Sequence, residues 1–180
     1  MPRLREFAVE LQLPFLGKVA GVWAPDDRER QAAWELYVEM VTRVAVVPLV
    51  EGGGSLREAL SSHYTLFATT REILKKHGPE LARPHDGGQL SFGYIAIAVL
   101  NGAVRPLLTE WHPRLETYEG SRPAGRSPVE WERAWADAST MRAQVEACRT
   151  ALLDYAELLA EVADIQLLHG HEVGGSPSSS

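Results

Sequence analysis

Arg105 and His112 are the two residues whose types and spacing most directly suggest chemistry. They stand seven positions apart in residues 92–113, a segment that begins as an apolar run and then acquires polar groups. A histidine can move protons near neutral pH, and an arginine can hold a phosphate with two parallel N–H donors. The pair therefore offers a proton-transfer group and a phosphate-binding group on one predicted helix.

This Arg-x6-His spacing resembles the arginine–histidine signature of the HEPN helical-bundle ribonucleases. The resemblance implies metal-independent cleavage of RNA, in which Arg105 and His112 would act on a 2′-hydroxyl and the scissile phosphate. Pro106 follows the arginine, where that family usually has a polar residue, and two further arginine–histidine pairs in the chain have similar spacings. The ribonuclease is therefore the alternative hypothesis, and structural roles for both residues are the default.

A second group of polar residues could form a ligand pocket. Asn101 and Arg105 lie one helical turn apart and share a face, while Arg71 and His63 lie on or beside the apolar stripe of the preceding helix. One interpretation is an internal polar pocket that senses a small anionic ligand. The default is an internal network of ion pairs and hydrogen bonds that fixes how the helices pack.

Trp111, Trp131 and Trp135 are predicted to meet at one end of the molecule. Trp131 and Trp135 are one turn apart on a helix, and Trp111 ends the helix before it. Buried indole N–H groups need hydrogen-bond acceptors. Core packing is the default interpretation of this cluster, and an aromatic interface for a protein partner is the alternative.

The sequence predicts neither a metal nor a cofactor. It has no Glu-x-x-His or His-x3-His pair on a helix, and the glycine-rich residues 51–55 lack the lysine of a phosphate-binding loop. Cys148 is the single cysteine, which excludes an internal disulfide, and it falls on a predicted core position.

Composition and charge narrow the class of protein. The 180 residues carry a net charge of −6, with 45 % hydrophobic and 23 % charged residues, as expected for one globular domain. We expect no DNA partner, RNA only under the ribonuclease alternative, and no membrane, since the longest apolar run is shorter than the roughly 20 residues of a membrane span. The start of the chain lacks a secretory pattern, and arginine far outnumbers lysine, so we expect a cytoplasmic protein from a bacterium with a GC-rich genome.

The elements that must position these residues are mainly helical. Alternating apolar residues predict a strand at 7–13, which forms a short N-terminal β-hairpin or extended arm with residues 19–23. Helices are predicted at 26–47, 56–77, 90–111 and 128–162. The first should bury a stripe with Trp34, the third should kink at Pro106 and free the Gly102 carbonyl, and the fourth should bury a stripe from Ala134 to Val162.

The fold class is therefore a mainly α, up-and-down four-helix bundle, with the hairpin or arm in residues 1–25, the bundle in 26–169 and a disordered C-terminal tail in 170–180. A long heptad-like stripe requires a partner along its whole length. The leading hypothesis is a non-catalytic protein that binds a protein partner or itself, possibly as a homodimer.

Overall fold

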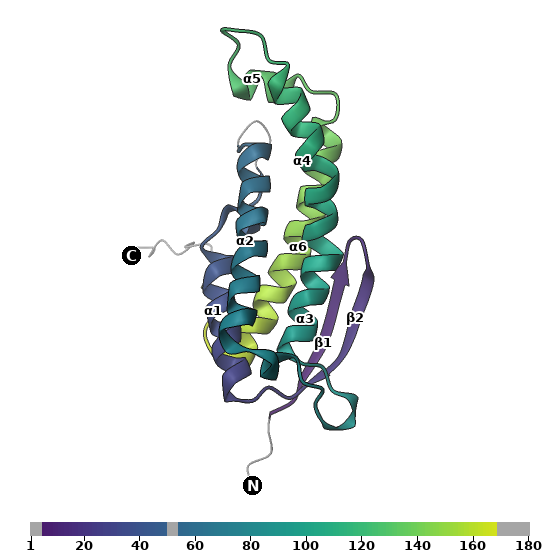
Figure 1. Ribbon diagram of the computed structural model, residues 1–180, viewed down its shortest axis with the longest axis vertical. Helices are drawn as coiled ribbons and strands as arrows, with labels where there is room; N and C mark the ends of the chain where they lie inside the picture. The colour runs from purple at the N-terminus through teal and green to yellow at the C-terminus, as the bar shows by residue number, and fades with distance from the viewer. Residues whose placement is uncertain (1–4, 50–53, 169–180) are drawn as a thin grey trace, which may run out of the picture.

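The computed structural model describes residues 5–49 and 54–168, and the chain is mainly helical with one β-hairpin at its start (Figure 1). The strands are β1 (Phe7–Leu13) and β2 (Gly17–Trp23), and the helices are α1 (Asp27–Val41), α2 (Leu56–His77), α3 (Phe92–Val99), α4 (Arg105–Gly120), α5 (Pro128–Arg133) and α6 (Ala138–Ala163). Short 3₁₀ turns lie at Val44–Val46, Pro79–Ala82 and Asp86–Gly88. The predicted disordered tail, residues 170–180, lies outside the described residues.

The hairpin is confirmed, with the predicted alternation. β1 pairs antiparallel with β2, so that Phe7 faces Trp23 and Leu13 faces Gly17. Every second residue of β1 is buried, because that face of the hairpin packs against α6 while the other face meets solvent. The N-terminal segment is thus a packed part of the fold and not an extended arm.

Helix α1 begins where its cap predicts but buries a different stripe. Asp26 and Glu29 form a reciprocal capping box at its start. The helix ends at Val41, before the expected 47, and Trp34 is 41 % exposed. The prediction that Trp34 lies on the buried stripe was wrong. The face packed against α6 carries small and long apolar residues instead: Ala32, Ala33, Leu36, Tyr37 and Met40.

Helix α2 matches its predicted bounds. Ser55 caps it by accepting a hydrogen bond from the Glu58 N–H, and Gly78 follows its end at φ +81°, a conformation that side-chain-bearing residues rarely adopt. Leu60 and His63 are among its buried residues. This helix therefore contributes both a core face and an exposed face, as its pattern predicts.

The third predicted helix is longer than expected and contains a π-helical turn. α3 continues through the π turn (Leu100–Val104) into α4, which runs to Gly120 with Pro113 inside it. The prediction that this helix ends at Trp111 was wrong. Pro106 has no N–H, so the Gly102 carbonyl loses its helical partner as expected, and it accepts instead from the Phe15 N–H at 2.9 Å.

Gly102 also allows the hairpin to approach this helix. A Cβ at position 102 would lie 2.7 Å from Leu16 Cβ and 2.8 Å from Leu13 Cδ1, which is too close for real atoms. The turn of the hairpin therefore docks where the helix has no side chain and a free carbonyl.

The run Phe92–Gly120 is long and apolar enough to cross a membrane by length and composition alone. However, 56 % of its most apolar stretch is buried inside the protein. A core helix of a soluble protein passes the same test, and this run contacts α2, α6 and the hairpin.

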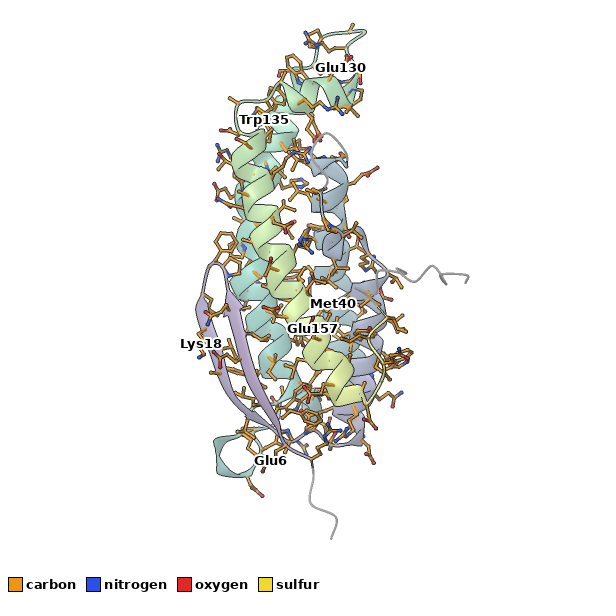
Figure 2. All side chains as sticks on the ribbon, turned by 180° about the vertical axis from the view of Figure 1, so that it is seen from behind. Glu6, Lys18, Met40, Glu130, Trp135 and Glu157 are labelled. Carbon is orange, nitrogen blue, oxygen red and sulfur yellow. The ribbon has the colours of Figure 1, made fainter. Side chains whose placement is uncertain are left out.

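The fourth predicted helix is two helices. α5 ends at Arg133 and α6 begins at Ala138, with Trp135 buried in the break and Ala134 exposed, so the predicted stripe fails at Ala134. From Met141 to Val162 the predicted stripe is buried. Figure 2 shows α6 running along the back of the molecule, with Glu157 on its outer side, and its inner face contacts α1, α2 and α4.

The Tyr155 hydroxyl is the polar atom at the centre of this core. A buried tyrosine hydroxyl usually has a hydrogen-bond partner. The Tyr155 side chain is 2 % exposed, and its oxygen has no partner among the described residues. Burial raises the pKa of this phenol.

Replacing Tyr155 by phenylalanine should raise the free energy of unfolding by roughly 1 kcal/mol, because it removes a buried hydroxyl without an acceptor. Tyr37 is the matched control, since it is also fully buried but its hydroxyl accepts from the Leu168 N–H at 2.7 Å. Tyr37→Phe should cost about 1 kcal/mol. Urea denaturation of both variants measures the difference, and equal losses would show that the Tyr155 hydroxyl has a partner.

Candidate functional site

An open groove lies between α2 and α4, which stand side by side in Figure 1. We call it the α2–α4 groove, and its volume is about 230 Å³. Its lining residues are Tyr64, Phe67, Ala68 and Arg71 from α2 and Arg105, Leu108 and Thr109 from α4. The groove thus combines apolar lining residues with two cationic side chains.

Neither arginine of the groove has a carboxylate partner among the described residues. The Arg105 guanidinium instead lies over the Phe67 ring, with its Cζ 5.5 Å from the ring centroid, a cation–π contact. Several arginines elsewhere are ion-paired: Arg57 binds Glu119 at 2.6 Å and Arg114 binds Asp137 at 2.8 Å. The groove therefore presents two uncompensated positive charges on an acidic chain.

The exposed face continues from the groove down α3. Tyr94, Ile97, Asn101 and Arg105 follow one another at spacings of three and four, so they lie along one side of the helix. Tyr94 is 56 % and Ile97 46 % exposed, while Tyr64 on α2 is 64 % exposed. We call Tyr64, Arg71, Tyr94, Ile97 and Arg105 the α2–α3–α4 face.

The structure brings together two of the four predicted pocket residues. Arg71 and Arg105 line the groove, and Asn101 lies one turn from Arg105 on the exposed side. His63 lies on the buried side of α2 and does not line the groove. The site is open to solvent and not internal. Apolar residues occupy the buried side of the α3–α4 run, and the polar residues Asn101 and Arg105 lie on its exposed side.

His63 is a core histidine. Its Nδ1 lies 2.7 Å from the Ala59 carbonyl oxygen, so Nδ1 carries the proton and donates, and Nε2 has no partner among the described residues. The side chain is fully buried. Burial lowers the pKa of His63, although the hydrogen bond to Ala59 opposes this shift.

The lowered pKa of His63 predicts acid sensitivity. Below the ordinary value of 6.5 the unfolded chain binds a proton that the folded chain does not, so stability falls with decreasing pH until the lowered pKa is reached. The slope should be up to about 1.4 kcal/mol per pH unit. Urea denaturation of His63→Gln between about pH 7 and pH 5 should show a flatter dependence. The exposed His112→Gln is the control, and an equal flattening there would contradict the assignment.

Arg105 and His112 do not meet in one site. Both are exposed on α4, and seven residues of helix separate them by about 10.5 Å along the axis. His112 is absent from the groove lining, and its Nε2 lies 3.8 Å from Glu116 Oε2. Two groups acting on one phosphate would have to converge, and this geometry does not bring them together on their own helix.

The three predicted tryptophans do form one cluster, with a tyrosine between them. Trp111 and Trp135 meet edge to face at 5.9 Å, and Tyr118 stacks on Trp131 at 4.8 Å and on Trp135 at 5.3 Å. The Trp111 indole donates to Gln144, and the Trp131 indole donates to the Tyr118 carbonyl. Sequence reasoning missed Tyr118 because it ended the helix at Trp111.

A second hollow, of about 400 Å³, lies beside this cluster between the start of α2, the end of α4 and α5. Arg57 binds Glu119 through two nitrogens, and the Glu132 carboxylate accepts from the Leu56 N–H at 3.0 Å and from Arg142 at 3.0 Å. These charges are already paired within the chain. They fasten α5 to α2 and α6, and α2 to α4. The lining of this hollow includes the carboxylates of Glu58, Glu119 and Glu132, so it offers less to an anionic ligand than the α2–α4 groove, which no acid lines.

Glu29 is a buried charge that sequence reasoning did not single out. It is 1 % exposed and accepts from the Phe92 N–H at 2.8 Å and the Asp26 N–H at 3.1 Å, with His85 Nε2 at 3.0 Å. The carboxylate thus joins the N-terminal ends of α1 and α3, where helix dipoles favour a negative charge. Across residues 5–49 and 54–168, no three His, Cys, Asp or Glu side chains gather as metal ligands.

Comparison with known proteins adds no function to this geometry. No protein-family model, no curated protein and no solved structure matches the chain.

Proposed function

We propose that this chain is a non-catalytic, cytoplasmic bacterial protein that binds a protein partner through the α2–α3–α4 face. The frame is an up-and-down four-helix bundle formed by α1, α2, the α3–α4 run and α6. The observation that carries the proposal is the exposure of Tyr64, Tyr94 and Ile97 on the same face as Arg71 and Arg105, which have no carboxylate partner among the described residues. Tyrosine and arginine are enriched at protein interfaces, where they act as anchors.

The size of the groove favours a protein partner over a small ligand. At about 230 Å³ it is below the roughly 300–1,000 Å³ of typical small-molecule sites. It can accept one side chain of a partner, while Tyr94 and Ile97 extend the contact along α3. The small-anion sensor is therefore secondary to a protein partner, and the tests below separate a heterologous partner from self-association.

A photo-crosslinking experiment tests the proposal. Benzoylphenylalanine replaces Tyr64 or Tyr94 in the full chain, with Glu157 on the outer side of α6 as the matched control position (Figure 2). We expect both face positions, and not position 157, to yield one discrete adduct with another protein in cells. The identified partner should then bind the purified chain, and Ile97→Asp should weaken that binding.

Absence of a discrete adduct at both positions would overturn the proposal. An adduct with a second copy of this chain would identify self-association instead. Under the ribonuclease alternative the purified protein would cleave RNA without metal, and His112→Ala would abolish cleavage; we expect intact RNA with either protein.

A further inference from the structure

We infer that the partner inserts an apolar side chain bearing or adjoining a carboxylate into the α2–α4 groove, where Arg71 and Arg105 bind the carboxylate. This inference rests on the proposed function and specifies the chemistry of its central contact.

The charges that line the α2–α4 groove favour an anionic group on the partner. The chain has 24 acidic against 18 basic residues and a net charge of −6, so an arginine has many possible carboxylate partners on its own chain. Arg71 and Arg105 face the same groove, yet neither is ion-paired among the described residues. A carboxylate from outside would meet two guanidinium groups and no competing acid, because no Asp or Glu lines this groove.

The apolar lining residues of the groove favour an apolar side chain on the partner. Phe67, Ala68 and Leu108 are its apolar lining residues, and the Arg105 guanidinium lies over the Phe67 ring. An apolar group bound there would contact these side chains while its anionic end reached Arg71 and Arg105. Tyr64 and Thr109 also line the groove.

The volume limits how large this group can be. About 230 Å³ accommodates one aromatic or branched aliphatic side chain, not a nucleotide or a lipid. Matching motifs in the partner are an acidic residue next to an aromatic one, or a C-terminal carboxylate on an apolar last residue. Both place the same two chemical groups a few bonds apart.

The test uses the full chain labelled with ¹⁵N and three soluble probes. 3-Phenylpropionate carries the phenyl ring and carboxylate, 3-phenylpropionamide lacks the charge, and phenyl phosphate replaces the carboxylate. We expect 3-phenylpropionate to shift the amide resonances of Tyr64, Phe67 and Arg105 with a Kd of about 1 mM, and the amide to bind about tenfold more weakly. The double variant Arg71→Gln/Arg105→Gln should lose this preference.

Arg83→Gln is the matched control, because Arg83 is also exposed but is already paired with Glu80 at 3.1 Å. It should leave binding of 3-phenylpropionate unchanged. Equal binding of the acid and the amide, or tighter binding of phenyl phosphate than of the carboxylate, would overturn the inference.

The two proposals fail in different ways. If cross-linking at Tyr64 identifies a partner but the groove shows no carboxylate preference, the chemistry of the contact is wrong and the partner-binding function stands. If the groove binds the carboxylate but no partner is found, the groove is a small-ligand site and the proposed function is wrong.

Discussion

Replacing Glu29 by alanine is expected to lower the free energy of unfolding by about 3 kcal/mol. The substitution would leave the Asp26 and Phe92 N–H groups without their acceptor, and Phe92 N–H is buried. Each unsatisfied buried donor costs about 1–3 kcal/mol. The loss should appear in urea denaturation monitored by circular dichroism.

Asp27→Ala is the matched control, because Asp27 is an exposed acid on the first turn of the same helix. Its loss should be below about 1 kcal/mol, the scale of a surface charge near a helix start. If Glu29→Ala costs no more than Asp27→Ala, the carboxylate does not join the two helix ends as the distances indicate.

Replacing Leu152 by alanine is expected to lower the free energy of unfolding by about 2–5 kcal/mol. Leu152 is 1 % exposed and lies on the α6 stripe, beside Leu36 of α1, Leu66 of α2 and Val99 of α3. Truncation would leave a cavity where residues of four helices meet. Thermal and urea unfolding measure the loss.

Ile97→Ala provides the comparison, since it removes a similar apolar group from a side chain that is 46 % exposed. Ile97→Ala should lower the free energy of unfolding of the isolated chain by less than about 1.5 kcal/mol, because a half-exposed side chain buries less apolar area on folding. Similar losses at both positions would place the α6 stripe at a surface or the α3 face in a core.

Short-range patterns predicted the elements whose own residues determine them. The alternation in β1 identifies the strand and its buried face, since a one-residue shift would expose every apolar side chain. The two ends of α2 were predicted correctly from Ser55 and Gly78, because helix capping and helix termination depend on a few adjacent residues. The α6 stripe follows from its spacing in the same way.

The sequence-based predictions failed where contacts between residues far apart in the sequence determine the local structure. In α1 two apolar stripes have the helical period, and contact with α6 selects the one that contains the alanines and leaves Trp34 outside. The break before α6 buries Trp135 against Trp111 and Tyr118, which compensates for the interrupted helix. Neither outcome can be read from local periodicity.

The candidate site was predicted in part for the same reason. Spacing placed Asn101 and Arg105 on one face, and the structure adds that Arg71 of the neighbouring helix lies across the groove from Arg105. Sequence patterns could not show whether that face is buried or exposed. Residues 92–100 are apolar on all sides of the helix, so some of them, such as Tyr94 and Ile97, are exposed although the run as a whole predicts burial.

The hydrogen bond from Phe15 to Gly102 makes the hairpin and the third helix one cooperative unit. Pro106 removes a donor from the helix, and the turn of the hairpin supplies the replacement from a distant part of the sequence. Opening either element exposes the same amide, so exchange of the Phe15 amide proton with solvent reports on both.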